Sequence, residues 1–289
     1  MIVINDISLL LPEGCRKLYA DDVKLFKVVR SYADCVELQQ LVDIFSLWCS
    51  RNLLSVSIQK CSVISFYRTR KPILFDYTMS GQPLSKVTQI RGLGVILDTA
   101  LSFKLHYNEI IAKANRQLGF MFKIANEFRD PFCLRSLYFS LVRSILEFCS
   151  VVWCLFHNSW IARIESVQRK FVRYALKFLP WRNPSNQSAF TDRYRLLGMK
   201  TLEQRRFEAQ TAFIGKVVLN EIDAPEILGY LDIYAPERSL RPRSLLNLPQ
   251  RNAQYGQFDP IRFMSASFNT VADAFDFNIT GTAFFFPYV

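Results

Sequence analysis

The sequence is poor in histidine and has no glycine-rich phosphate motif. Only His106 and His157 occur among 289 residues, and the seven cysteines include no C-x-x-C pair, so the usual spacings of a zinc site are missing. No Walker-type or dinucleotide-binding glycine pattern is present, and the serines near the histidines form no nucleophile elbow. These absences argue against zinc, P-loop, dinucleotide and serine-hydrolase sites, and neither histidine is assigned a role.

Long hydrophobic runs are also missing. The most apolar stretch, residues 144–156, is interrupted by Glu147 and is too short to span a bilayer. The first eleven residues contain Asp6 and have neither a basic start nor a small-residue cleavage site, so a signal peptide is not expected. The cysteines are odd in number and scattered through apolar runs, which is typical of reduced residues in a protein core. We therefore expect an intracellular protein, cytoplasmic or nuclear and not secreted, with no membrane partner.

Apolar residues and positive charge are abundant. Half of the residues are hydrophobic and 25 are phenylalanine, which is enough apolar surface to fold most of the chain into one large or two ordinary domains. The formal net charge of +11 favours a polyanionic partner, either nucleic acid or an anionic membrane surface.

Two adjacent carboxylates lie near the start of the chain, in Tyr19-Ala20-Asp21-Asp22. The runs on either side are rich in β-branched and aromatic residues and are separated by only two residues, which predicts a tight hairpin with both acids at its tip. Neighbouring carboxylates repel, and a hard cation such as Mg²⁺ would neutralise them. Aspartate is also common in turns because its side chain bonds the nearby backbone, so the hairpin alone favours neither interpretation.

The remaining periodicity predicts an α+β fold with a helical second part. Ser31 and Asp34 form a predicted capping box for a helix over residues 32–51, and short extended segments, with a hairpin at Ser80-Gly81, continue to Leu97 as one small sheet. Helical periodicity follows over residues 102–129, 134–153, 159–178 and 201–221. Thr201 and Gln204 form a second predicted capping box, and Pro131 suits the first turn of a helix. We predict three regions: residues 1–100, 101–223, and an irregular, partly disordered tail over 224–289 with at most one short helix.

Basic residues concentrate between Trp160 and Arg206, where eleven cations face three acids. Arg169, Arg173 and Lys177 are four residues apart and form one helical stripe, which would track phosphates if it faced a groove. The alternative is an ordinary solvated helix face. Lys60, which follows the first helix, is predicted either to return towards the hairpin or to be a surface lysine.

The order of several short motifs resembles the reverse transcriptases of non-LTR retrotransposons, specifically the jockey-like group. The motifs are Tyr19-Ala20-Asp21-Asp22, Trp48-Cys49, Asn52-Leu53-Leu54, Lys60-Cys61, Leu93-Gly94-Val95-Ile96-Leu97-Asp98, Lys113-Ala114-Asn115, Leu141-Val142-Arg143-Ser144-Ile145-Leu146-Glu147, Val151-Val152-Trp153, Ile164-Glu165-Ser166-Val167-Gln168 and Leu202-Glu203-Gln204-Arg205-Arg206. Each is weak alone, but the ordered set is specific and covers roughly residues 1–270.

The resemblance implies a polymerase palm over residues 1–100 followed by a helical thumb or connection. It implies that Asp21 and Asp22 belong to a catalytic Mg²⁺ site, and that Lys60 assists the leaving pyrophosphate. Tyr19 would lie near the primer end. The partners would be an RNA template, its RNA/DNA hybrid and deoxynucleotides, with nucleic acid held by Arg163, Arg169, Lys170, Arg173 and Lys177.

The matching region begins just upstream of the hairpin, so the family's first metal-binding aspartate and its fingers have no counterpart here. Asp6 matches a position on the preceding helix and does not replace that ligand. We therefore expect a C-terminal fragment of a polymerase that is inactive alone. The alternatives are a non-enzymatic RNA- or DNA-binding remnant that uses the basic helices, or a product without function that aggregates through an exposed sheet edge.

Overall fold

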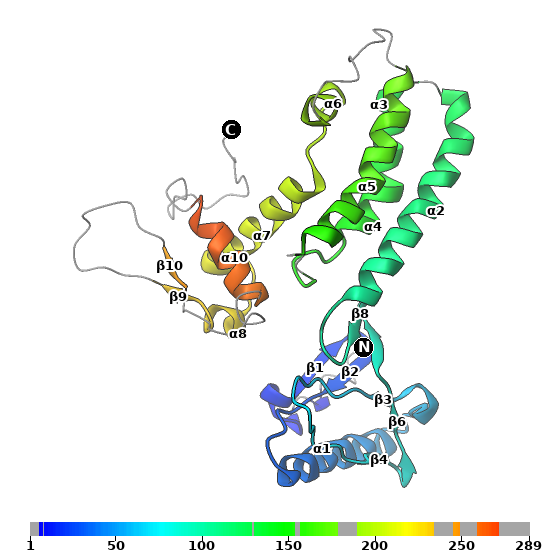
Figure 1. The fold of residues 1–289 in the computed structure, drawn as a ribbon. Helices are drawn as coiled ribbons and strands as arrows, with labels where there is room; N and C mark the ends of the chain where they lie inside the picture. The colour runs from blue at the N-terminus through cyan, green and yellow to red at the C-terminus, as the bar shows by residue number, and fades with distance from the viewer. Residues whose placement is uncertain are drawn as a thin grey trace, which may run out of the picture. The chain divides into compact units, whose positions relative to one another are not determined.

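The computed structural model describes residues 6–7, 9–128, 130–153, 157–178, 190–233, 245–248 and 259–271. The chain forms two compact units, Met1–Leu105 and His106–Val289 (Figure 1). Most of the described strands lie in the first unit and the long helices in the second. The α+β class is thus confirmed in its coarse form, whereas the assignment of palm, thumb and tail stays a prediction.

The strands of the first unit are short and pair two by two. They are β1 (Arg16–Tyr19), β2 (Asp22–Leu25), β3 (Ser62–Val63), β4 (Thr78–Met79), β5 (Gln82–Pro83), β6 (Ser85–Lys86), β7 (Gln89–Gly92) and β8 (Val95–Asp98). The pairs β1–β2, β4–β5 and β7–β8 are antiparallel, and β3–β6 is parallel. In the described part of this unit, the one small sheet predicted from the sequence is instead four separate two-stranded pairs, three of which are antiparallel. Ser80 and Gly81, between β4 and β5, and Leu93 and Gly94, between β7 and β8, all have positive φ. These two-residue turns are tight, so each joins two neighbouring strands into a hairpin.

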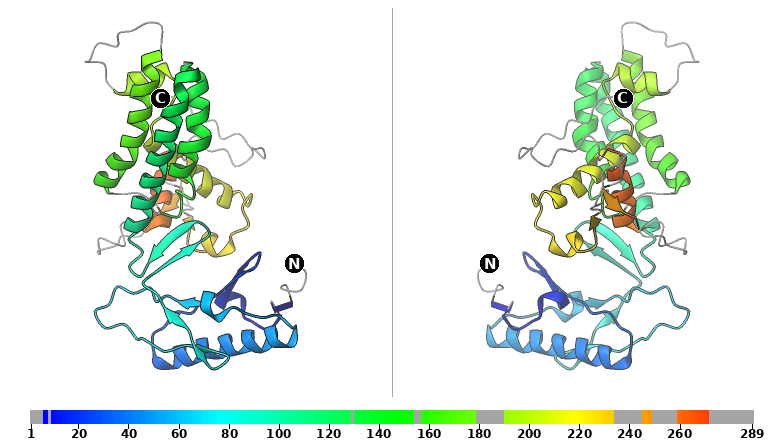
Figure 2. Two further views of the ribbon diagram at one scale, coloured as in Figure 1. Left: turned by 90° about the vertical axis from the view of Figure 1, so that its right-hand side faces the viewer. Right: turned by 90° about the vertical axis from the view of Figure 1, so that its left-hand side faces the viewer.

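Helix α1 (Tyr32–Arg51) supports these strands on one side (Figure 2). Its predicted capping box is confirmed: the Ser31 hydroxyl accepts from the Asp34 backbone, and the Asp34 carboxylate accepts from the Ser31 N–H at 2.8 Å. A buried cluster of Ile7, Leu11, Trp48 and Cys49 joins the end of α1 to the inner face of the β1–β2 hairpin. Burial of this apolar surface fixes the hairpin on the helix.

The second unit is built mainly from helices. They are α2 (Lys104–Phe128, which begins just before the unit), α3 (Pro131–Tyr138), a π-helical turn (Phe139–Arg143), α4 (Ser144–Glu147), α5 (Asn158–Ala175), a 3-10 turn (Leu176–Phe178), α6 (Phe190–Leu196), α7 (Leu202–Val218), α8 (Pro225–Leu228) and α10 (Pro260–Asn269). The chain runs along α2, returns through α3 and α4, and runs again along α5, so α2 and α5 are parallel (Figure 1). Asp130 caps α3 with Pro131 at its first position, as predicted.

The helix predicted over residues 134–153 ends instead at Glu147. Phe148 leaves the helical conformation with ψ of 124°, and Cys149 has φ of +53°. Trp153 is nevertheless buried, and its ring N–H donates to the Phe148 carbonyl at 2.8 Å. The apolar run continues through this bend, although Phe148 and Val152 are about half exposed, so hydrophobicity gave no signal of the helix end.

The described part of the region after Ala224 is more ordered than the irregular tail predicted from the sequence. It contains α8, a short antiparallel pair β9 (Asp232–Ile233) and β10 (Leu246–Asn247), and α10. Helix α10 buries Met264 and Phe268 against Ile214 and Val217 of α7. Two further segments lie outside the described residues: residues 181–186, whose proline, asparagine and serine content predicts a loop, and the apolar, non-periodic residues 284–289. Among the helices that the structure describes, none has the length and hydropathy needed to cross a bilayer.

Candidate functional site

The predicted hairpin is confirmed, with a small shift in its turn. Tyr19 pairs with Asp22, so Ala20 and Asp21 form the two-residue turn and Asp22 is the first residue of β2. Ala20 has φ of +50°, a left-handed conformation that a residue other than glycine rarely adopts. Both carboxylates are exposed at the end of a rigidly paired ladder. The structure therefore presents two acids together on a tight turn.

The two faces of this hairpin differ. Leu18, Val23 and Leu25 are half-buried on the side of the α1 cluster, whereas Tyr19 and Asp22 are exposed on the opposite face. A Cβ atom on Gly92 would come within 3.0 Å of the Lys24 Nζ, so the side chain of Lys24 reaches strand β7. The exposed face of Tyr19 and the two aspartates thus adjoins the β7–β8 hairpin within the first unit.

Lys60 is exposed at the end of a 3-10 turn, Ile58–Lys60. Within the described ranges its ammonium group makes no ion pair or hydrogen bond with Asp21 or Asp22. The geometry therefore brings the two acids together but does not join Lys60 to them, and its catalytic role stays a prediction.

The acids at the turn supply two oxygen-bearing groups for a cation. In the part of the chain that the structure describes, no group of three or more histidine, cysteine, aspartate or glutamate side chains is placed to hold a metal ion. Mg²⁺ takes six oxygen ligands and often keeps several waters, so Asp21 and Asp22 fit part of a magnesium shell. They do not complete a metal centre.

A second candidate site is the outer face of α5. Three cations on this helix are exposed, Arg163, Lys170 and Arg173, and Lys177 is exposed in the 3-10 turn that follows it and is counted here with the same face. Its one carboxylate, Glu165, is buried. Arg169 is only half-exposed, and its guanidinium donates to the Ala162 carbonyl at 3.1 Å. The predicted stripe thus keeps Arg173 and Lys177, and the exposed face carries cations without an acid.

Asparagines of α2 hold two of these cations. The Arg163 guanidinium donates to Asn108 Oδ1 at 3.0 Å, and the Lys170 ammonium donates to Asn115 Oδ1 at 2.9 Å. The two residues of each pair are 55 positions apart in the sequence. The second pair lies seven residues further along both helices than the first. Seven residues are about two turns, so the pairs repeat along the seam between two parallel helices. We did not predict these asparagines, although the matching spacing was present in the sequence.

Aromatic rings support the same seam. The Arg163 guanidinium lies 4.2 Å from the ring centre of Trp160, and Lys177 lies 5.7 Å from that of Tyr174. Tyr174 also stacks on Phe122 of α2, with ring centres 4.1 Å apart. Cation–π contacts restrict the long basic side chains, which lowers the entropy lost when they bind an anion.

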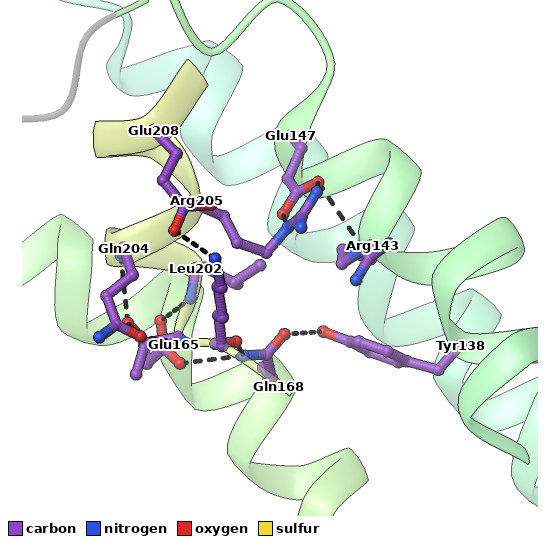
Figure 3. Close-up of polar contacts among 11 residues, drawn as sticks. Tyr138, Arg143, Glu147, Glu165, Gln168, Leu202, Gln204, Arg205 and Glu208 are labelled. Carbon is purple, nitrogen blue, oxygen red and sulfur yellow. Dashed lines mark hydrogen bonds and ion pairs between the residues drawn. The ribbon is translucent and has the colours of Figure 1, made fainter. Parts of the chain in front are cut away.

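The inner face of α5 is anchored by a buried polar network (Figure 3). Glu165 accepts from the Leu202 backbone N–H at 3.0 Å and from the Tyr194 hydroxyl at 2.7 Å. Gln168 donates to the Lys200 carbonyl and accepts from the Tyr138 hydroxyl. Burial raises the pKa of Tyr138, so its hydroxyl stays protonated as a donor. These bonds fix α5 to α3, α6 and the start of α7.

An ion pair next to this network joins α4 to α7. Glu147 accepts from two nitrogens of Arg205, and the hydrogen bond raises the pKa of Arg205 (Figure 3). Arg143 also approaches Glu147, at 3.7 Å, while burial lowers the pKa of Arg143. Arg205 is one of the eleven cations counted in the sequence, and its charge serves this internal contact.

Comparison with known proteins gives one relationship. The chain is similar to the RNA-directed DNA polymerase from mobile element jockey of Drosophila funebris, with 24% identity over 171 residues. The similarity is to a reverse transcriptase. The matched segment covers 56% of this chain but only 18% of the relative. No family model and no solved structure matches the chain. The comparison supports a reverse-transcriptase-like relationship and leaves the roles of individual residues to be tested.

Proposed function

We propose that the chain supplies a metal-binding hairpin and a nucleic-acid-binding helical region of an RNA-directed DNA polymerase from a non-LTR retrotransposon. The observation that carries this proposal is the position of Tyr19-Ala20-Asp21-Asp22 on a tight, exposed hairpin. The similarity to the jockey polymerase supports it. The polymerase belongs to the nucleotidyltransferases, and its partners would be an RNA template, the RNA/DNA hybrid and deoxynucleotides.

In this proposal Asp21 and Asp22 each give an oxygen ligand to Mg²⁺. Tyr19 contacts the primer end beside them, and Lys60 acts on the leaving pyrophosphate. Two carboxylates are too few for a stable two-metal centre. The chain alone therefore binds Mg²⁺ weakly and does not extend a primer.

A chimera tests the proposal. Residues 1–223 of this chain, which contain the hairpin and the basic helix, replace the corresponding part of the jockey polymerase, and primer extension on an RNA template is measured with Mg²⁺. We expect extension that falls by more than about 10³-fold in D21N and D22N variants, because each removes a charged metal ligand. D6N is the matched control, since Asp6 is exposed and lies outside the hairpin. A folded, template-binding chimera that shows no extension, or equal extension in D21N, would contradict the assignment.

A second candidate function is nucleic-acid binding without catalysis. It is favoured by the exposed face of α5, where Arg163, Lys170, Arg173 and Lys177 are not opposed by a carboxylate of the same helix. The contacts with Asn108 and Asn115 hold two of these cations in place. Ordered cations along about 21 Å of helix suit a duplex backbone better than a single small anion.

Titration of an RNA/DNA hybrid at several salt concentrations tests this second function. Changing Lys170, Arg173 and Lys177 to glutamine removes three exposed charges, and we expect the slope of log K against log salt to fall by about 2 to 3. The matched control changes Arg51, Arg70 and Lys71, exposed cations of the first unit, to glutamine. D21N is expected to leave binding unchanged. Equal slopes for the two triple variants would remove the α5 face as the binding surface.

A further inference from the structure

The outer face of the β1–β2 hairpin carries two cations behind the acids of its turn. Lys17 and Tyr19 of β1 and Asp22 and Lys24 of β2 are exposed and alternate with half-buried residues, so their side chains lie on one face. In the strand register Tyr19 is opposite Asp22, and Lys17 is opposite Lys24. Two like charges that face each other across strands repel, so a bound anion would stabilise this part of the face.

The side chain of Lys24 is placed over the β7–β8 hairpin of the same unit. Its ammonium nitrogen is 3.0 Å from the position that a Cβ atom on Gly92 would take, and its Cε atom is 4.0 Å from that position. Gly92 thus leaves the room that the end of the lysine side chain occupies. Any residue with a side chain at position 92 would displace the ammonium group, so the glycine of β7 helps to place this cation.

The charge of Lys24 is not used within the described part of the chain, where its ammonium group makes neither a hydrogen bond nor an ion pair. Asp22 precedes it by two residues on the same face, and two residues of a strand span about 7 Å. The face therefore presents acids at the turn and, about 7 Å behind them, a positioned cation that an external anion can reach.

We propose that Lys24 binds a backbone phosphate of the primer strand, one of the first two from its 3′ end. This inference rests on the proposed function, in which the acids at the turn hold Mg²⁺ and Tyr19 contacts the primer end. One strand of a duplex carries a phosphate about every 3.4 Å along its axis. A cation about 7 Å behind Asp22 is therefore at the level of the first or second phosphate. Lys17, opposite Lys24, adds positive charge beside the same phosphates.

A thermodynamic cycle between Lys24 and single phosphates tests the proposal. The full chain is titrated with an RNA template annealed to a fluorescent DNA primer, with Mg²⁺ at low salt, and fluorescence anisotropy gives the affinity. In a series of primers, one linkage at a time is a methylphosphonate, which carries no charge. For the wild-type chain we expect a loss of about threefold to fivefold when the first or the second linkage is neutral. K24M should lower the affinity for the unmodified primer by the same factor and show no further loss at that linkage.

The variants separate the charge of Lys24 from its packing. Methionine keeps most of the unbranched stem and removes the charge, whereas K24R keeps the charge and should retain the sensitivity to the neutral linkage. The matched control is K71M, which removes an exposed cation of the same unit outside the hairpin and should retain full sensitivity. Circular dichroism checks that each variant keeps its fold.

Three results would overturn the proposal. If K24M and each neutral linkage lower the affinity independently, Lys24 does not contact the primer, although the proposed function stands. If the losses are independent and K24M also weakens binding of a deoxynucleoside triphosphate, Lys24 serves the nucleotide instead. If the wild-type chain does not bind the primer and template, or no linkage near the 3′ end affects its affinity, the hairpin does not hold the primer end and the proposed function fails as well.

Discussion

At the scale of single residues, the carboxylates of this chain have different roles, which depend on how far each is buried and on which groups donate hydrogen bonds to it. Asp21 and Asp22 are exposed beside each other on a turn, where a cation would stabilise them. Glu165 is buried, and three hydrogen-bond donors surround its oxygens. Asp98 lies at the end of β8 and accepts four bonds from the segment that leads into α2. Only the first pair is free to meet a ligand.

Replacing Asp98 with alanine should destabilise the protein in a pH-dependent way. Partial burial raises the pKa of Asp98, but hydrogen bonds from Ser102, Ala100 and Phe103 outweigh it and leave the pKa below the ordinary value of 3.8. The charged form is therefore favoured by folding, so its contribution is complete above pH 3.8 and is lost as the pH falls through the lower, folded-state pKa. We expect D98A to lose about 1–2 kcal/mol at pH 7 and less near pH 3, measured by urea unfolding.

D98N is the control for this effect. Its amide oxygen still accepts from the backbone, so the loss at pH 7 should be smaller, and the decrease in stability between pH 4 and pH 2 should be smaller than in the wild type by the contribution of Asp98. A D98A loss that is the same at both pH values would show that Asp98 acts through packing and not through its charge.

At the scale of elements, α5 combines two functions on opposite faces. Glu165 and Gln168 fasten its inner face to neighbouring helices, whereas its exposed face carries cations. A helix held in this way keeps its basic side chains at fixed spacings, which favours a regular polyanion. Helix α10 is fastened by a different means, because its contact with α7 is largely apolar.

Truncation of Phe268 tests how strongly α10 contributes to the fold. Its ring is fully buried against α7. We expect F268A to lower the free energy of unfolding by about 3–5 kcal/mol, as large-to-small core changes do. Y230A is the control, because Tyr230 is an aromatic residue of the same unit that is 76% exposed, and it should change stability by less than about 0.5 kcal/mol. Equal unfolding midpoints for the two variants would mean that α10 is not part of the cooperative core.

Local signals in the sequence were sufficient to predict those elements whose ends are marked by a capping residue or a two-residue turn. The capping residues Ser31 and Thr201 marked the starts of α1 and α7, and the two-residue spacing marked the β1–β2 turn. The break after Glu147 was missed because apolar residues continue through it. Helix α10 was missed because Asp259-Pro260, a good helix start, lies in a proline-rich region. Long-range pairing of Asn108 and Asn115 with α5 required the packing of two helices, which spacing within one helix does not reveal.

At the scale of the whole molecule, the net charge of +11 and the buried apolar core respond differently to salt. Binding of a nucleic acid releases condensed counterions, and its affinity falls steeply with salt. Burial of apolar surface in the core releases few ions, so the free energy of unfolding changes little with moderate salt.

Raising the salt concentration should therefore weaken nucleic-acid binding without unfolding the chain. Between about 50 mM and 200 mM NaCl, four phosphate contacts predict a loss of about 10²-fold in hybrid affinity. Over the same range the free energy of unfolding should change by less than about 1 kcal/mol. Fluorescence anisotropy measures the affinity and urea unfolding measures the stability. An affinity that does not change with salt would contradict binding through phosphate contacts.

The constant offset between α2 and α5 limits which changes of length this protein tolerates. Arg163 and Lys170 each find an asparagine 55 positions earlier, since both helices advance in step. A deletion of one residue inside α5, between these two cations, would rotate every later side chain by about 100° and turn Lys170 and Lys177 away from the seam. A change of length between α4 and α5 would alter the number 55 but not the spacing of seven. Insertions should accordingly accumulate between these helices in related sequences and be rare within them.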